Sequence, residues 1–112
     1  MTIKDPGHYL FNDMDEAAQK HWSSLLVPQP ATPHLSPTKN GGYLHVPCGY
    51  FLGTKDNTCP LSLQEAMLKG ARDLGANVQE FRGDTSHSPY LSWTEGLVDL
   101  ITDFARPLTS ST

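Results

Sequence analysis

The chain has 112 residues, of which 38% are hydrophobic and 18% charged, which is typical of one small globular domain and excludes a wholly disordered chain. Its formal charge of -4 gives no positive field that would attract nucleic-acid phosphates or an anionic membrane surface. The amino-terminal stretch MTIKDPGHYLFNDMDE has charges and a proline where a secretory signal has an apolar core, and no apolar run approaches the ~20 residues of a membrane span. We therefore expect a cytoplasmic protein with no nucleic-acid or membrane partner.

The first predicted helix begins at Asp13, which has the spacing of a capping box with Glu16. Apolar residues then recur on one helical face, and Pro28 and Pro30 end the helix. These apolar residues are Ala18, Trp22, Leu25 and Leu26. Residues 27–42, rich in proline and glycine, are expected to form a connecting loop.

A strand is predicted over residues 48–53, after Pro47, which cannot donate a hydrogen bond to a sheet. The run is apolar on both faces, as in a parallel strand that is covered by helices. A strong helix pattern follows, with a capping box at Ser62 and Glu65 and a left-handed C-cap at Gly75. Its repeating apolar positions are Leu63, Ala66, Met67, Gly70, Ala71 and Leu74.

The second predicted strand covers residues 77–81 and is followed by a loop over 82–91. A third helix begins at the capping box of Ser92 and Glu95 and ends at Pro107. Its expected buried face consists of Leu97, Val98, Ile101, Phe104 and Ala105.

The expected fold class is therefore α/β, with a βαβα unit of two parallel strands over 43–107. Residues 1–42 precede it as a helix and a proline-rich loop, and 108–112 follow as a frayed tail. Two parallel strands leave two open edges, whereas parallel sheets are normally larger and buried on both faces. The chain would then add its strands to another polypeptide, cover them with the proline-rich segment, or be a truncated product of marginal stability.

Two titratable residues are predicted to meet beyond the carboxyl ends of the strands. Asp56 follows the first strand and His87 the second, and parallel neighbours place both loops at one edge of the sheet. A carboxylate in that position can orient an imidazole and stabilise its protonated form. The alternatives are a turn-forming role for Asp56 and an exposed loop position for His87.

Three stretches resemble parts of the α/β-hydrolases between Tyr9 and Phe104. FLGTKDNTCPLSLQEAM, with a proline four residues after Asp56 and a glutamine-bearing helix behind it, is similar to the acid loop. VQEFRGDTSHSPYLSWTEGLVDLITDFA is similar to the final strand, the histidine loop and the last helix. YLFNDMDEAAQKHWSSLLVPQP resembles the end of the cap in small fungal-type hydrolases related to plant methyl-ester esterases and hydroxynitrile lyases.

The resemblance implies a partial α/β-hydrolase fold in which residues 1–42 derive from the cap and 43–107 from the carboxy-terminal core. It also implies that Asp56 is the acid and His87 the general base of a Ser-His-Asp triad that hydrolyses carboxylic esters. The sequence departs from the family because it has no G-x-S-x-G nucleophile motif and no upstream oxyanion loop. Loss of a triad nucleophile costs about six orders of magnitude in turnover, so this truncated hydrolase should be weak or inactive alone.

Other candidate residues have simpler interpretations. Ser86 and Ser88 flank His87 and are expected to fix its loop by hydrogen bonds rather than act as nucleophiles. Asp84 is the reserve acid if Asp56 points away. Cys48 and Cys59 are expected to be structural thiols, with a disulfide as the alternative. The remaining histidines lack metal-ligand spacing, so neither a metal nor a cofactor is expected.

Two other functions compete with that of a hydrolase. The chain could be an assembly subunit whose open strand edge completes the sheet of a partner chain or joins another copy of itself. It could also be a non-catalytic domain of a biosynthetic pathway that binds an apolar metabolite. The small-molecule partner is accordingly expected to be an ester or an apolar metabolite.

Overall fold

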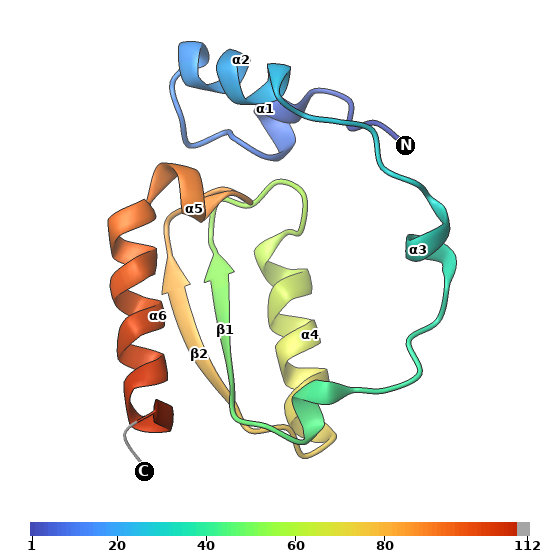
Figure 1. The fold of residues 1–112 in the computed structure, drawn as a ribbon, viewed down its shortest axis with the longest axis vertical. Coiled ribbons are helices and arrows are strands. Elements are labelled where there is room, and N and C mark those ends of the chain that lie inside the picture. Colours follow the sequence, from blue (N-terminus) through green and yellow to red (C-terminus); the bar gives the residue numbers. More distant parts are fainter. Residues whose placement is uncertain (110–112) are drawn as a thin grey trace.

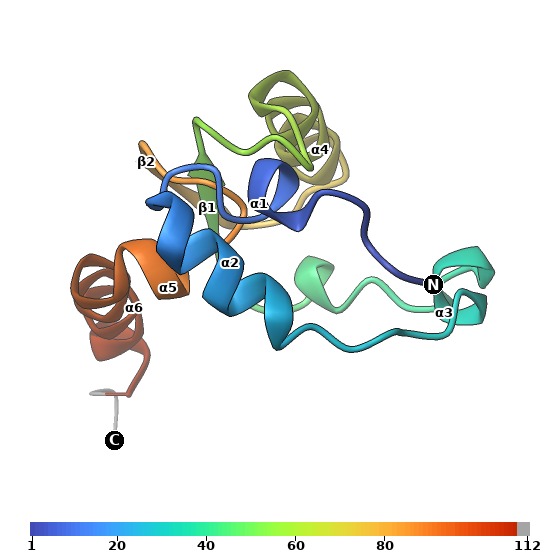
Figure 2. The ribbon, with the colours of Figure 1, turned by 90° about the horizontal axis from the view of Figure 1, so that it is seen from above.

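The computed structural model describes residues 1–109, and its centre is a two-stranded parallel sheet (Figure 1). Strand β1 (Cys48–Gly53) is joined to β2 (Val78–Gly83) by helix α4 (Leu61–Asp73), and helix α6 (Thr94–Thr109) follows β2. The view from above shows α4 and α6 on opposite sides of the strands (Figure 2). The predicted α/β class and the parallel pairing are confirmed.

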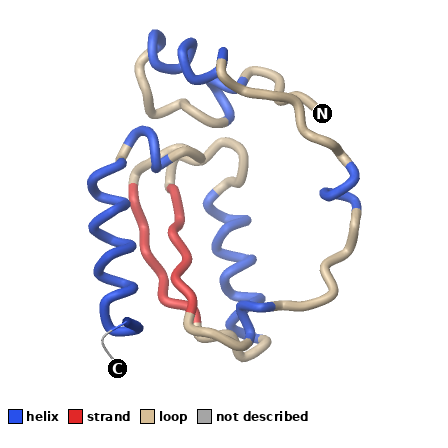
Figure 3. The backbone as a smooth tube through the Cα atoms, viewed as in Figure 1, coloured by secondary structure: helices blue, strands red, loops and turns tan. Residues whose placement is uncertain are grey.

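The other helices are short; one of them connects β2 to α6, and the rest precede β1 (Figure 3). They are α1 (Pro6–Tyr9), α2 (Glu16–Ser24), α3 (Thr32–Leu35), the 3-10 turn η1 (Gly42–Leu44) and α5 (Pro89–Ser92). The α1–α2 segment lies beyond the carboxyl ends of the strands, and the segment that carries α3 lies apart from the sheet (Figure 1). Among the described residues, no helix is long and apolar enough to cross a bilayer.

The predicted start of the first helix is wrong by two residues. The N-cap of α2 is Asp15, whose carboxylate accepts a hydrogen bond from the backbone N–H of Ala18 at 2.8 Å. Asp13 instead accepts hydrogen bonds from Ser86 and Ser92. These long-range partners are invisible to a local pattern of capping residues.

The start of α4 also differs from the prediction. Pro60 occupies the N-cap without a side-chain cap, and its carbonyl accepts the N–H groups of Leu63 and Gln64. Ser62 therefore lies inside the helix and does not form the predicted capping box. At the other end Gly75 has a φ of 93°, which confirms the left-handed conformation predicted there.

The carboxy-terminal boundaries shift as well. β2 continues to Gly83 because residues 82 and 83 pair with the last two residues of β1. Ser92 ends α5 and binds Asp13, so it does not cap α6, which begins at Thr94. The predicted end at Pro107 is wrong, because α6 continues to Thr109 with Pro107 inside it. The fixed φ of proline is compatible with a helix, and its missing N–H costs one hydrogen bond near the helix end. Of the predicted tail, Leu108 and Thr109 complete α6, and 110–112 lie outside the described residues.

The apolar faces predicted for the helices are largely uncovered. Met67 and Leu74 of α4 are 46% and 67% exposed, and Val98 and Ile101 of α6 are both 55% exposed. Leu25 and Leu26, at the end of the first predicted helix, are exposed too. The buried apolar side chains are Leu10, Phe11, Leu52, Leu68 and Ala76.

The molecule exposes more surface than its size requires. Its accessible area is 8039 Å², whereas a compact monomer of 12.3 kDa exposes about 6,100 Å². Its radius of gyration is 16.0 Å, against about 13 Å for a compact domain of this length. Residues 27–40 of the proline-rich loop are all exposed, so this loop does not cover the sheet as one of the expectations required.

Candidate active site

The loops that follow β1 and β2 bring the two predicted residues together. Asp56 Oδ2 lies 2.8 Å from His87 Nδ1, and the side chains are 8% and 42% exposed, respectively. The parallel pairing of β1 with β2 places both loops at the carboxyl edge of the sheet. Nε2 of His87 has no hydrogen-bond partner among the described residues, so it is available to exchange a proton.

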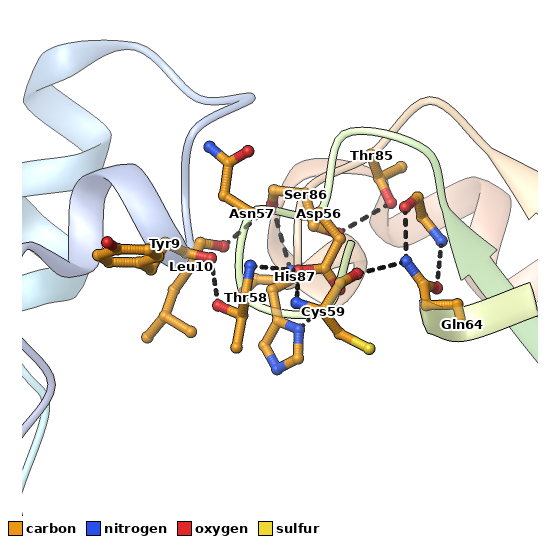
Figure 4. A network of polar contacts seen from close by, with 12 residues as sticks. Tyr9, Leu10, Asp56, Asn57, Thr58, Cys59, Gln64, Thr85, Ser86 and His87 are labelled. Atoms are coloured by element: carbon orange, nitrogen blue, oxygen red, sulfur yellow. Dashed lines mark hydrogen bonds and ion pairs between the residues drawn. The ribbon is translucent and has the colours of Figure 1, made fainter. Parts of the chain in front are cut away.

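The carboxylate of Asp56 is held at both oxygens (Figure 4). Oδ1 accepts the backbone N–H groups of Thr58 at 2.8 Å and Cys59 at 2.9 Å, which leaves Oδ2 for the imidazole of His87. The turn-forming role considered for Asp56 and its role as the partner of His87 are therefore both present. The turn fixes the direction in which the second oxygen points.

Gln64 joins the end of β1 to the acid loop. Its buried side chain accepts the N–H of Gly53 at 3.1 Å and donates to the carbonyls of Gly53 at 2.9 Å and Cys59 at 2.7 Å (Figure 4). These bonds use both hydrogens of the amide and one of the two lone pairs of its oxygen. A glutamine on the helix behind the acid loop is visible in the sequence, but no local pattern indicated that its side chain would point inward.

The amino-terminal segment holds the acid loop from the opposite side. The side chains of Asn57 and Thr58 donate to the carbonyls of His8 and Tyr9 at 2.9 and 2.6 Å. The side chain of Asn12 donates in return to the carbonyl of Lys55 at 2.7 Å. Residues 8–13, which sequence reasoning did not connect with the site, therefore form part of its frame.

Asp13 ties the same segment to the histidine loop. Its Oδ2 accepts the N–H of Ser86 at 2.9 Å and the hydroxyl of Ser92 at 2.6 Å. Burial raises the pKa of Asp13, but the hydrogen bonds from Ser86 and Ser92 outweigh it, so the pKa lies below the ordinary value of 3.8. The charged form of Asp13 is thus the one that fits this position.

The other sequence candidates lie outside the acid and base roles. The hydroxyl of Ser86 is buried and donates to the carbonyl of Leu10 at 3.0 Å, while Ser88 is fully buried. The hydroxyl of Ser86 also accepts the N–H of Ser88 at 3.2 Å, so Ser86 fixes the loop by hydrogen bonds as predicted. The hydroxyl of Ser88 has no hydrogen-bond partner among the described residues, so this prediction is wrong for Ser88. Asp84 accepts a hydrogen bond from Thr54 at 2.7 Å, and among the described residues no hydrogen bond or ion pair joins it to His87.

A cleft of about 500 Å³ runs from the free side of β1 to the Asp56–His87 pair. Its walls are mainly apolar and aromatic, and include Tyr50, Met67 and Leu97. Cys59 also lines it and is a free thiol, as is Cys48. Burial and then the charge of Asp56 raise the pKa of the Cys59 thiol, which keeps it in the protonated, weakly nucleophilic form.

The charge of the acid loop also acts on Tyr50. Burial raises the pKa of Tyr50, and Coulombic repulsion from the thiolate that Cys59 forms at high pH and from Asp56 raises it further. The phenol is therefore a neutral donor in the cleft at physiological pH. Among the described residues, no three histidine, cysteine, aspartate or glutamate side chains are arranged to hold a metal ion.

The structure thus places the carboxylate of Asp56 against the imidazole of His87, in a geometry in which the acid orients a base, beside an open cleft. Comparisons of the chain with protein-family models, with curated proteins and with solved structures gave no match.

Proposed function

We propose that Asp56 and His87 are the acid and the general base of a serine-hydrolase type of site, and that its reaction is hydrolysis of a carboxylic ester. The observation that carries the proposal is the 2.8 Å contact between Asp56 Oδ2 and His87 Nδ1. A carboxylate on Nδ1 fixes the proton there and leaves Nε2 to accept a proton from a nucleophile.

The order of the parts supports the same reaction class. The acid follows one strand and the histidine the next parallel strand, and this order resembles that of the α/β-hydrolases. The mainly apolar cleft beside the pair suits the acyl or alcohol part of an ester better than a charged substrate. The chain is, on this proposal, related to the carboxy-terminal part of such an enzyme.

The proposal also limits the activity of the isolated chain. Residues 1–112 contain no G-x-S-x-G motif, and the two serines beside His87 are buried. Among the described residues, no hydroxyl is hydrogen-bonded to Nε2 of His87, so water takes the place of the nucleophile in this proposal. We expect slow hydrolysis of an activated ester that depends on the imidazole of His87.

Hydrolysis of p-nitrophenyl acetate tests this proposal. Turnover by the chain should be slow and should fall to the buffer rate in His87→Ala, and Asp56→Asn should reduce it because the imidazole loses its fixed orientation. His34→Ala is the matched control, since His34 is an exposed histidine far along the chain in α3. A rate that His34→Ala and His87→Ala lower equally would contradict the role of His87.

A further inference from the structure

The edge of β1 that faces away from β2 is open. The N–H groups of Cys48 and Thr54 donate to Asn77 and Gly83, so even-numbered residues of β1 bond toward β2. Backbone groups of successive strand residues point to opposite edges, so Gly49, Phe51 and Gly53 present theirs to the free edge. Gln64 occupies the groups of Gly53.

The backbone groups of two residues are left without partners. Gly49 and Phe51 have no hydrogen-bond partner for their outward N–H and C=O groups among the described residues. An orphaned backbone edge of this kind is a template for another strand. A bound strand would pair next to Gly49 and Phe51 and stop where Gln64 closes the edge.

The clefts along this edge have the volume and the apolar lining that an added strand requires. Three clefts meet at Gly49, with volumes of about 540, 500 and 200 Å³. The first lies against Met67 and Leu68 of α4, and the third against Ile101 and Phe104 of α6. The space therefore has apolar walls on both faces of the sheet. Besides cysteine and tyrosine side chains, the titratable residues that line the three clefts are Asp56 and His87, at the carboxyl end of the strand.

The uncovered surface of the molecule is large enough to contain a protein interface. The surface excess over a compact monomer is about 1,900 Å², and part of it lies on the uncovered faces of α4 and α6. A standard interface removes about 800 Å² from each partner. A strand in the groove would bury much of Met67 and Ile101, which are 46% and 55% exposed.

We propose that the free edge of β1 between α4 and α6 binds an extended strand of another polypeptide, one that is apolar on both faces and uncharged along the paired stretch. This proposal does not rest on the chemistry of the Asp56–His87 pair, although the occupant would reach that pair at the end of the groove. A second copy of the chain fits less well. Edge-to-edge pairing about a twofold axis places two α4 helices on the same face, and α4 already lies beside β1 (Figure 2).

Amide hydrogen exchange with a model strand tests the proposal. The probe is a synthetic peptide of five valines between lysine pairs, N-methylated at alternate valines so that a single edge can pair. Gly49 and Phe51 amides should exchange freely in the protein alone and slow by at least about tenfold with the peptide. The amides of Tyr50 and Leu52, which face β2, should be protected in both states.

Two controls make the test specific. Met67→Lys places a charge in the groove and should abolish the peptide-dependent protection. Leu74→Lys, at the C-cap of the same helix and outside the lining, should leave the protection intact. Absence of protection, or equal protection by a peptide N-methylated at every valine, would overturn the proposal. Protection of Gly49 and Phe51 without peptide, together with a doubled mass, would assign the edge to a second copy and overturn it too.

Discussion

Asp13 joins the amino-terminal segment to the histidine loop through a single carboxylate oxygen. Its partners, Ser86 and Ser92, lie more than seventy positions away along the chain. Because Ser86 immediately precedes His87, the hydrogen bond from the Ser86 N–H to Asp13 helps to fix the backbone position from which the imidazole extends. Charge-assisted hydrogen bonds of this type are stronger than neutral ones, so Asp13 should contribute to stability as well as to the placement of the loop.

Asp13→Asn should destabilise the protein in a manner that depends on pH. Since the pKa of Asp13 is lowered in the folded state, its contribution is complete above the unfolded pKa and is lost as the pH falls through the folded pKa. We expect a loss of about 1–2 kcal/mol in unfolding free energy at pH 7, shrinking toward zero below the ordinary pKa of 3.8. Chemical denaturation at both pH values measures it.

Asp15→Asn is the control for this prediction. Asp15 caps α2, and asparagine is an equally good N-cap, so its stability should change little at either pH. A loss in Asp13→Asn that stays constant or grows in acid would mean that the charge of Asp13 is not what the loop requires.

At the scale of elements, the side chain of Gln64 joins α4 to the end of β1. The buried face of α4 consists of Gln64 and Leu68, while most of its apolar positions face solvent. The side chain of Gln64 satisfies the outward groups of Gly53 and holds the carbonyl of Cys59. The acid loop therefore depends on a helix that begins after it.

Gln64→Ala should cost about 1–3 kcal/mol in unfolding free energy, because it leaves backbone groups of Gly53 and Cys59 without partners. Gln64→Glu should be worse at neutral pH, since a carboxylate cannot donate to two carbonyls. Gln79→Ala, at an exposed position of β2, is the matched control and should change stability by less than about 0.5 kcal/mol. Equal stability of Gln64→Ala and Gln79→Ala would contradict this role.

Elements were predictable from the sequence where the signal was local. The bounds of β1, the left-handed Gly75 and the parallel order of strands follow from Pro47, from glycine conformation and from the spacing of the segments. Helix starts were not, because Asp13, Ser62 and Ser92 have capping spacing but are used otherwise.

At the scale of the whole molecule, the sequence predicted which residues would meet but not what would hold them. Parallel strands place the ends of β1 and β2 at one rim, so the approach of Asp56 to His87 followed from topology. The frame made by residues 8–13 depends on side-chain bonds across most of the chain, and no periodicity encodes these.

Burial could not be predicted either. Periodic apolar residues on α4 and α6 predicted helix faces in contact with a core, and periodicity does not reveal whether such a core is supplied by the same chain. The structure leaves these faces exposed. The strand that we propose for the open edge of β1 would cover part of these exposed faces.

The protonation state of the His87 ring tests the central claim most directly. Nitrogen-15 NMR of the neutral imidazole should find the proton on Nδ1 and a bare Nε2, because Asp56 accepts from Nδ1. Asp56→Asn should remove this preference, and His34 in the same spectrum provides an exposed reference. A proton on Nε2 of His87, unchanged by Asp56→Asn, would contradict the claim that the carboxylate prepares this histidine as a base.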